Sequence, residues 1–127
     1  MSNKKVLVVD DDAKLREALR AALETAGLSV LEAPNGAEGL AMALKYKPDL
    51  ILLDIMMPKM NGHETLNELR KDSWGKTAEV LLLTSLDDVD NIATGVGAKS
   101  DDYIIKSNMS LDEIIKKVKQ HLAGYHD

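Results

Sequence analysis

Four short aliphatic runs in this 127-residue chain end on polar side chains that could do chemistry together. Asp10 and Asp11 follow the first run, Asp54 closes the second, and Thr84 and Lys106 close two more. Such runs are typical of strands buried inside a parallel sheet. An aspartate at a strand end is often only a turn residue, but ligands of open α/β sheets also bind there. Taken alone, Asp54 therefore leaves both interpretations open.

The chemistry that these residue types could perform is metal-assisted phosphoryl transfer. Converging carboxylates repel one another unless a cation joins them, and oxygen ligands without His or Cys favour Mg²⁺. A carboxylate can act as a nucleophile and form an aspartyl phosphate. Asp54 is the candidate nucleophile, Lys106 would supply a positive charge and the Thr84 hydroxyl a hydrogen bond. The chain has no GxxxxGK[ST] loop, so ATP is not the expected donor.

Whether these side chains meet depends on the order of the elements. The sequence predicts strands over residues 5–9, 29–33, 50–54, 79–83 and 103–105, alternating with five helices. Such alternation gives a parallel sheet with right-handed crossovers and helices on both faces. All strands of a parallel sheet end on the same side, so the polar strand ends should converge. This convergence favours a functional site over a set of turns.

Helix boundaries are marked by capping residues. Asp12 is placed to cap the first helix, Asn35 the second and Ser110 the last, and Gly27 should end the first helix. The predicted buried faces are Leu15, Ala18, Leu19, Ala22, Leu23 and Ala26 in the first helix, Ala37, Leu40, Ala41 and Leu44 in the second, and Leu111, Ile114, Ile115, Val118 and Leu122 in the last.

Other segments carry weaker signals. Residues 89–97 form a poor helix because they include two glycines and β-branched residues. The half-polar run 29–33 suits an edge strand. His63 is expected to be solvated at the start of the third helix, and His121 to lie at a packing edge rather than bind a ligand.

The composition of the chain argues against several classes of function and location. The net charge of −5 argues against non-specific binding to nucleic acid or anionic lipid, and the absence of cysteine excludes disulfides and thiolate metal sites. No apolar run approaches a membrane span, and the first residues do not form a signal peptide. We expect one soluble cytoplasmic domain over residues 1–127.

The motifs resemble the receiver domain of two-component response regulators over essentially the whole chain. The resemblance is carried by Val-Val-Asp10-Asp11-Asp12, Leu-Leu-Asp54-Ile-Met-Met-Pro58-Lys-Met-Asn-Gly62, Leu-Leu-Thr84-Ser and Asp-Asp-Tyr103-Ile-Ile-Lys106. It implies a flavodoxin-like (βα)5 fold, a doubly wound five-stranded parallel sheet with strand order 2-1-3-4-5.

The resemblance also implies a role for each acidic residue. Asp54 would accept a phosphoryl group from a histidine kinase or phosphotransfer protein. Asp11 and Asp54 would bind Mg²⁺ directly, with the Met56 backbone carbonyl as third protein ligand and Asp10 acting through water. Lys106 would hold a phosphoryl oxygen.

The same resemblance implies a conformational switch. Thr84 would move toward the phosphoryl group while Tyr103 turns inward, which would remodel the face formed by the fourth helix, fifth strand and fifth helix. A downstream protein target would bind this face, and neither nucleic acid nor membrane is expected as a partner. Either the output is a protein partner or the chain is a fragment of a longer regulator, and of the two we expect a stand-alone regulator that is a monomer or weak homodimer. It would not be a conventional enzyme, because it would catalyse only its own phosphorylation and dephosphorylation.

Two positions depart from the family pattern. Ser107 follows Lys106 where the family usually has Pro after a cis peptide bond, and Ser85 stands where Ala is common. A cis bond before Ser costs roughly 2.5–4 kcal/mol, against about 0.5–1 kcal/mol before Pro. The sequence therefore leaves open whether this bond is cis, and with it the placement of Lys106.

Two alternative functions follow from the same residues. One is a receiver-like interaction module that is never phosphorylated. The other is a small metal-dependent phosphatase with an aspartate nucleophile. Haloacid-dehalogenase-like enzymes of that kind use a second Asp two residues after the nucleophile, where this chain has Met56.

Overall fold

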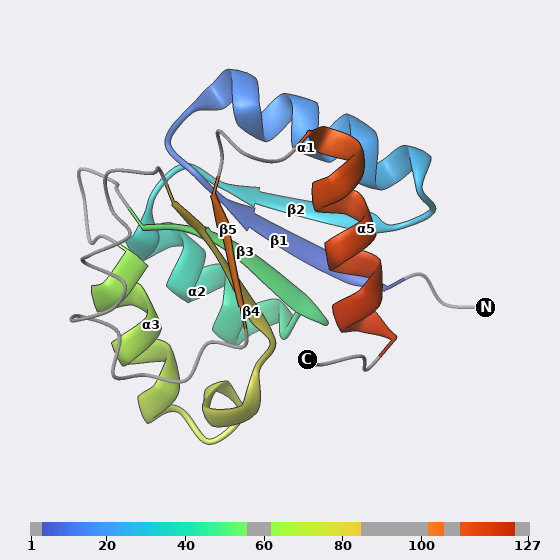
Figure 1. The fold of residues 1–127 in the computed structure, drawn as a ribbon. Helices are drawn as coiled ribbons and strands as arrows, with labels where there is room; N and C mark the ends of the chain where they lie inside the picture. Colours follow the sequence, from blue (N-terminus) through green and yellow to red (C-terminus); the bar gives the residue numbers. More distant parts are fainter. Residues whose placement is uncertain (1–3, 56–61, 85–101, 106–109, 124–127) are drawn as a thin grey trace.

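A parallel sheet of five strands forms the centre of the computed structural model (Figure 1). The structure describes residues 4–55, 62–84, 102–105 and 110–123, except for the side chains of Thr84 and of residues 102–105. The strands are β1 (Lys5–Val9), β2 (Ser29–Ala33), β3 (Leu50–Asp54), β4 (Val80–Thr84) and β5 (Asp102–Ile105). Their order, β2-β1-β3-β4-β5, is the predicted one, with the half-polar β2 at an edge.

Helices cover both faces of the sheet, as the doubly wound prediction requires (Figure 1). They are α1 (Ala13–Thr25), α2 (Gly36–Tyr46), α3 (Gly62–Lys71) and α5 (Leu111–Leu122), with a short 3-10 helix η1 (Gly75–Thr77) before β4. Packing separates into two layers: α1 and α5 lie over one face, and α2 and α3 over the other. The helix predicted over residues 89–97 lies outside the described residues.

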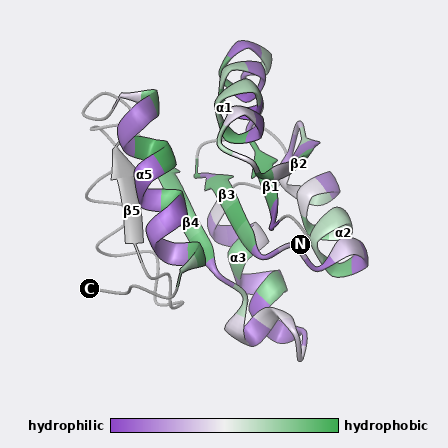
Figure 2. Ribbon diagram, turned by 90° about the vertical axis from the view of Figure 1, so that its right-hand side faces the viewer, coloured by the Kyte–Doolittle hydropathy of each residue, from purple (hydrophilic) through white to green (hydrophobic). Residues whose placement is uncertain are grey.

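Hydrophobic strand residues form the core between these two layers of helices (Figure 2). In β3 all five residues are buried, as expected of a central strand in a parallel sheet. The helices turn hydrophilic residues outward (Figure 2). None of the described helices is long and apolar enough to cross a membrane.

The predicted caps hold the helix ends. The Asp12 carboxylate accepts backbone N–H groups two and three residues on, at 3.0 and 3.2 Å, and the Asn35 side chain accepts one at 2.9 Å. Ser110 and Glu113 form a reciprocal capping box. Gly27, with φ +92°, follows the end of α1, in a conformation that other residues rarely adopt.

The buried face of α2 differs from the prediction. Leu40 packs partly buried against the core as predicted, but Ala37, Ala41 and Leu44 are exposed. The buried residues of the helix are instead Gly36, Gly39 and Ala43. A Cβ atom at Gly39 would lie 2.8 Å from both γ-carbons of Val9, so only glycine lets the helix approach β1 this closely. The prediction was wrong because it followed apolar side chains, and a glycine contributes none.

The face of α5 is confirmed except at its first residue. Ile114 and Val118 are buried and pack on the strands, whereas Leu111 is 38% exposed. Leu111 opens the helix beside a groove that α1 and α5 line together, so it lies at the rim of the core.

Candidate functional site

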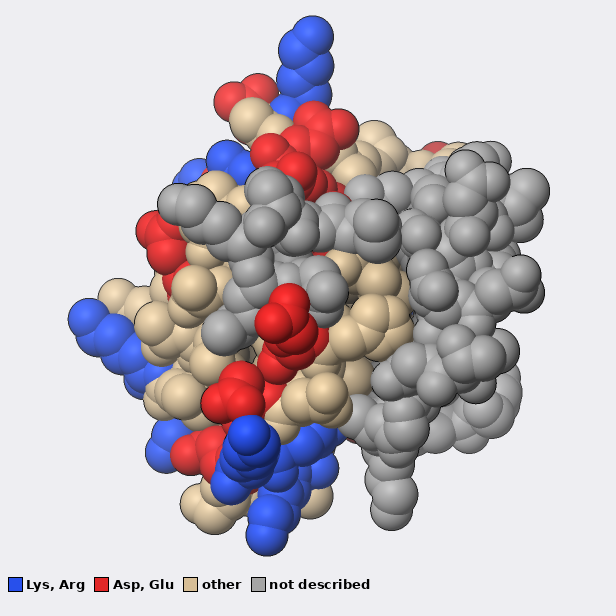
Figure 3. Space-filling view, turned by 90° about the vertical axis from the view of Figure 1, so that its left-hand side faces the viewer, with Lys and Arg blue, Asp and Glu red and all other residues tan. Residues whose placement is uncertain are grey.

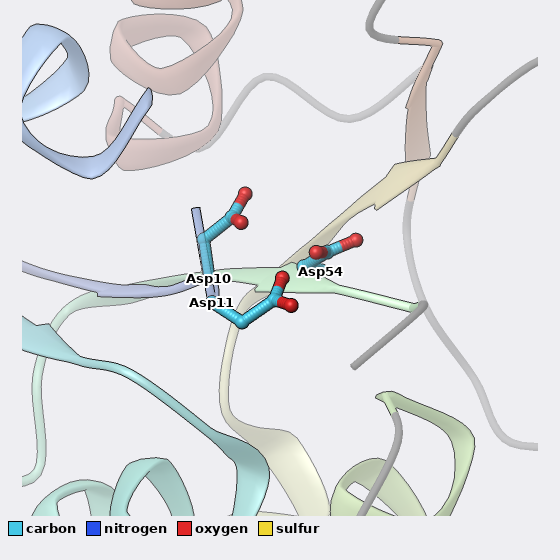
Figure 4. Close-up of side chains that lie close together, drawn as sticks. All are labelled: Asp10, Asp11 and Asp54. Atoms are coloured by element: carbon cyan, nitrogen blue, oxygen red, sulfur yellow. The ribbon is translucent and has the colours of Figure 1, made fainter. Parts of the chain in front are cut away.

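Three carboxylates meet at the end of the sheet where the strands finish. Asp10 and Asp11 follow β1 directly, and Asp54 is the last residue of β3. The two strands are paired, with Val9 beside Leu53. One oxygen of each carboxylate lies within 4.8 Å of the others (Figure 4). The predicted convergence of these three side chains is therefore confirmed.

The three carboxylates differ in their access to solvent. Asp10 is fully buried and Asp54 is 3% exposed, whereas Asp11 is exposed. Acidic side chains are visible on the face at which the strands end (Figure 3). The cluster thus has a buried floor and one open side from which a small ion or phosphoryl group could enter.

Asp10 is held by neighbours from several elements. Its N–H donates to the Ala33 carbonyl at 3.1 Å, its Oδ1 accepts the Asp12 N–H at 2.9 Å, and its carbonyl accepts Arg16 Nη1 at 2.7 Å. These contacts come from β2, from the loop after β1 and from α1. The residue is therefore fixed relative to three separate elements.

Arg16 was not singled out from the sequence, although one signal was present. Arg16 lies near the N-terminus of α1, where the helix dipole disfavours a cation, and no acidic residue occupies that first turn. A cation in such a position suggests a specific partner. In the structure its partners are the Asp10 carbonyl and the Glu32 carboxylate.

The electrostatics of the cluster favour a bound cation. Three carboxylates within 4.8 Å repel one another, and two of them are buried. A divalent ion among the carboxylates offsets this repulsion. The cluster offers only oxygen ligands, which suits a hard cation such as Mg²⁺.

For the other predicted site residues, the structure describes only the backbone of two of them. Thr84 ends β4 and pairs with Ile105, and Tyr103 pairs with Leu82, but their side chains lie outside the described part of the chain. Met56, Lys106 and the peptide bond to Ser107 also lie outside it. Their predicted roles remain predictions.

His63 does not lie where the sequence suggested. It is half-buried, and both ring nitrogens are shielded from solvent without a hydrogen-bond partner among the described residues. The expectation of a solvated side chain was wrong because the start of α3 packs against the end of β3, where Gly62 contacts Ile55.

Comparison with known proteins agrees with this fold. Residues 6–119 match the family model of the response regulator receiver domain. The chain belongs to this family. As a receiver domain it is a component of two-component signalling, which confirms the resemblance seen in its motifs.

Relatives of this receiver domain include named response regulators. The response regulator MprA of Mycobacterium leprae is 38% identical over 91% of this chain, and the phosphate regulon transcriptional regulatory protein PhoB of Pseudomonas aeruginosa is 39% identical over 94%. The aligned parts cover 49% and 52% of those proteins. The chain thus spans about half the length of these relatives.

Solved receiver-like structures match over nearly their whole length. The receiver domain of the Francisella response regulator 1452 is 35% identical, with a TM-score of 0.84 over 95% of this chain and 98% of that one. The chemotaxis protein CheY4 of Vibrio cholerae is 29% identical, with a TM-score of 0.85 over 94% and 98%. Both support the predicted flavodoxin-like fold.

Proposed function

We propose that this receiver domain is a phospho-accepting switch in which Asp54 takes up a phosphoryl group in a Mg²⁺-dependent reaction. The observation that carries the proposal is the grouping of the Asp10, Asp11 and Asp54 carboxylates within 4.8 Å at the open end of the sheet. Asp54 ends the central strand β3, next to the strand that delivers the other two.

The three acidic residues would have different roles in metal binding. Asp11 and Asp54 would bind the metal directly, together with the Met56 carbonyl, and the buried Asp10 would act through water. When bound, Mg²⁺ neutralises negative charge on the phosphoryl oxygens. The exposed Asp11 lies on the side from which the donor must approach, while the buried Asp10 forms the floor.

The transfer itself is a displacement at phosphorus. An oxygen of the Asp54 carboxylate forms the new P–O bond while the P–N bond of the donor phosphohistidine breaks and its electron pair stays on the ring nitrogen. Lys106 would hold a phosphoryl oxygen, and the Thr84 hydroxyl would donate a hydrogen bond to another. Hydrolysis by water later regenerates Asp54, so the domain processes only its own phosphoryl group and is not a conventional enzyme.

The phosphorylated form would signal through a surface. The proposed change couples Thr84 and Tyr103 and alters the face formed by residues 89–97, β5 and α5, where a downstream protein binds. The phosphoryl donor would be a histidine kinase or phosphotransfer protein in the cytoplasm. The acidic net charge of −5 supports protein partners rather than nucleic acid or membrane.

The proposal is tested by the intact mass of the protein after mixing with acetyl phosphate, with and without Mg²⁺. We expect a Mg²⁺-dependent phosphoryl adduct that is lost in Asp54→Asn. Asp49→Asn is a matched control, because Asp49 is exposed and precedes β3 at the opposite end of the sheet. Its carboxylate accepts the Lys5 N–H, the one hydrogen bond of that carboxylate within the described part of the chain.

Two outcomes would contradict the proposal. One is an adduct that persists in Asp54→Asn. The other is the absence of any adduct together with no response to beryllium fluoride, which would favour the unphosphorylated interaction module. Steady turnover of a phosphoester, which we do not expect, would favour the phosphatase.

A further inference from the structure

We infer that the ion pair between Arg16 and Glu32 is a positioning device for the acidic loop, residues 10–12, and that it sets the affinity of the cluster for a divalent cation. The inference rests on the proposed metal site. Neither residue contributes a ligand. Both act through the backbone that carries Asp10 and Asp11.

The first observation is the geometry of the Arg16 guanidinium. Its Nη1 donates to the Asp10 carbonyl at 2.7 Å, and its Nε donates to Glu32 Oε1 at 3.2 Å. The side chains of Arg16 and Glu32 are only 18% and 22% exposed. Because the guanidinium is planar and its donors point in set directions, one group links the loop to the edge strand with a defined geometry.

The second observation is that two consecutive residues of β2 hold the same residue of the loop. The Ala33 carbonyl accepts the Asp10 N–H at 3.1 Å, and Glu32 binds the arginine that holds the Asp10 carbonyl. Asp10 is therefore fixed on both sides of its α-carbon, on one side directly by Ala33 of β2 and on the other by Arg16 of α1, which Glu32 of β2 holds. Its carboxylate then accepts the Asp12 N–H, which extends the constraint across the loop.

Asp11 lies between these two held residues. The structure gives the exposed Asp11 side chain no hydrogen bond within the described part of the chain. Its position is consequently determined by the backbone on either side of it. If Arg16 no longer held the Asp10 carbonyl, the loop would gain freedom, and the carboxylates would have to be ordered again when a cation binds.

The effect of charge and the positioning role predict opposite changes in Mg²⁺ affinity when Arg16 is removed, so an experiment can separate them. A cation near the cluster repels Mg²⁺, and removal of Arg16 would then tighten metal binding. The positioning role predicts weaker binding. Arg16→Lys separates the two further, because it keeps the charge but lacks the planar fork that contacts the Asp10 carbonyl and Glu32 together.

Arg20 provides a matched control. It also pairs with Glu32, through Nη1 at 2.8 Å, and with Glu24 at 3.3 Å, but within the described residues it makes no hydrogen bond to the loop. It is 50% exposed. Arg20→Ala thus removes the same type of residue from the same helix, and one ion pair with the same carboxylate, without releasing Asp10.

The experiment is titration calorimetry of the metal-free protein with Mg²⁺, with amide hydrogen exchange of residues 10–12 measured on the same samples. We expect Arg16→Ala to weaken Mg²⁺ binding about tenfold and Arg16→Lys to recover only part of this loss. Glu32→Gln should weaken binding in the same direction by a smaller factor. Exchange in the loop should speed up in these variants and stay at the wild-type rate in Arg20→Ala.

The outcomes separate this inference from the proposed function. Unchanged or tighter Mg²⁺ binding in Arg16→Ala and Arg16→Lys, with an intact wild-type response to Mg²⁺ and acetyl phosphate, overturns only the inference. Failure of the wild type to bind Mg²⁺ overturns both. If Arg16→Ala does not fold, as judged by circular dichroism, Arg16→Lys and Glu32→Gln carry the same test.

Discussion

Gly62, the first residue of α3, lies so close to Asp54 that a Cβ atom on it would be 2.6 Å from the Asp54 carbonyl oxygen. The same atom would be 2.6 Å from the Ile55 α-carbon, and the Gly62 N–H donates to the Ile55 carbonyl at 2.8 Å. The start of α3 is thus packed directly against the end of β3. The backbone that carries Asp54 depends on the absence of a side chain at position 62.

Gly62→Ala should therefore disturb the phospho-accepting residue. The contact at 2.6 Å is with backbone, so the end of β3 or the start of α3 must shift. We expect a loss of about 1–3 kcal/mol in the free energy of unfolding and a fall of roughly tenfold or more in the rate of adduct formation with acetyl phosphate. Urea denaturation and time-resolved mass measurements check these two quantities.

Gly27→Ala is the control for this substitution. Gly27 has φ +92° and no atom within 4 Å of an added Cβ, so alanine there is strained only by its backbone conformation. It should cost about 1 kcal/mol of stability and leave the rate of adduct formation unchanged. An equal fall in rate for both variants would show that the rate follows stability rather than the Gly62 contact.

Asp11→Asn should change the stability of the protein in opposite directions with and without metal. In the metal-free protein the variant removes one of three carboxylates that lie within 4.8 Å, so its melting temperature should rise. In Mg²⁺ the wild type should gain about 2.7 kcal/mol at a concentration one hundred times the dissociation constant. The variant should gain much less. Thermal melts in EDTA and in Mg²⁺ measure both effects, and equal gains in the two proteins would exclude Asp11 as a ligand.

The capping box of α5 should make stability depend on pH. The Ser110 backbone N–H, followed by its hydroxyl, hydrogen-bonds the Glu113 carboxylate and lowers the pKa of Glu113 below its ordinary 4.5. Because the folded-state pKa is the lower one, this stabilisation is present above pH 4.5 and is lost as the pH falls through the folded-state value. Glu113→Gln should be less stable than the wild type at neutral pH, and the difference should shrink below pH 4.5.

Urea denaturation over this pH range provides the measurement. Ser110→Ala should cost about 1 kcal/mol through loss of the N-cap, and Asp112→Asn serves as a control at the neighbouring exposed carboxylate. If the difference in free energy of unfolding between Glu113→Gln and the wild type is the same at all pH values, the pKa of Glu113 is not lowered by the capping box.

His121 should contribute more to stability than a residue at the edge of a core. It is 6% exposed, and its Nδ1 lies 3.2 Å from Glu79 Oε2, so it joins the end of α5 to the residue before β4. His121→Ala should cost about 2–3 kcal/mol, since it removes a buried side chain and one partner of Glu79. Denaturation of Gln120→Ala, at an exposed neighbouring residue, gives the reference. An equally small loss in the free energy of unfolding in both variants would contradict a stabilising role for His121.

Much of this receiver domain could be predicted from local patterns in its sequence. Asp12, Asn35 and Ser110 cap their helices through hydrogen bonds to residues two or three positions away, so short-range chemistry determines them. The meeting of Asp10 with Asp54 was also predictable, because parallel strands end on one side of a sheet whatever their detailed packing.

Only the tertiary structure decided the contacts between residues far apart in the chain. Gly39 faces Val9 because a helix that lacks a side chain there can approach the strand, and hydropathy does not register this. Arg16 holds Asp10 and Glu32 together because β1, β2 and α1 meet at one point. The sequence by itself determined which groups reach the end of the sheet, since strand direction and capping are local. How firmly those groups are held was decided by packing, since each restraining contact comes from another element.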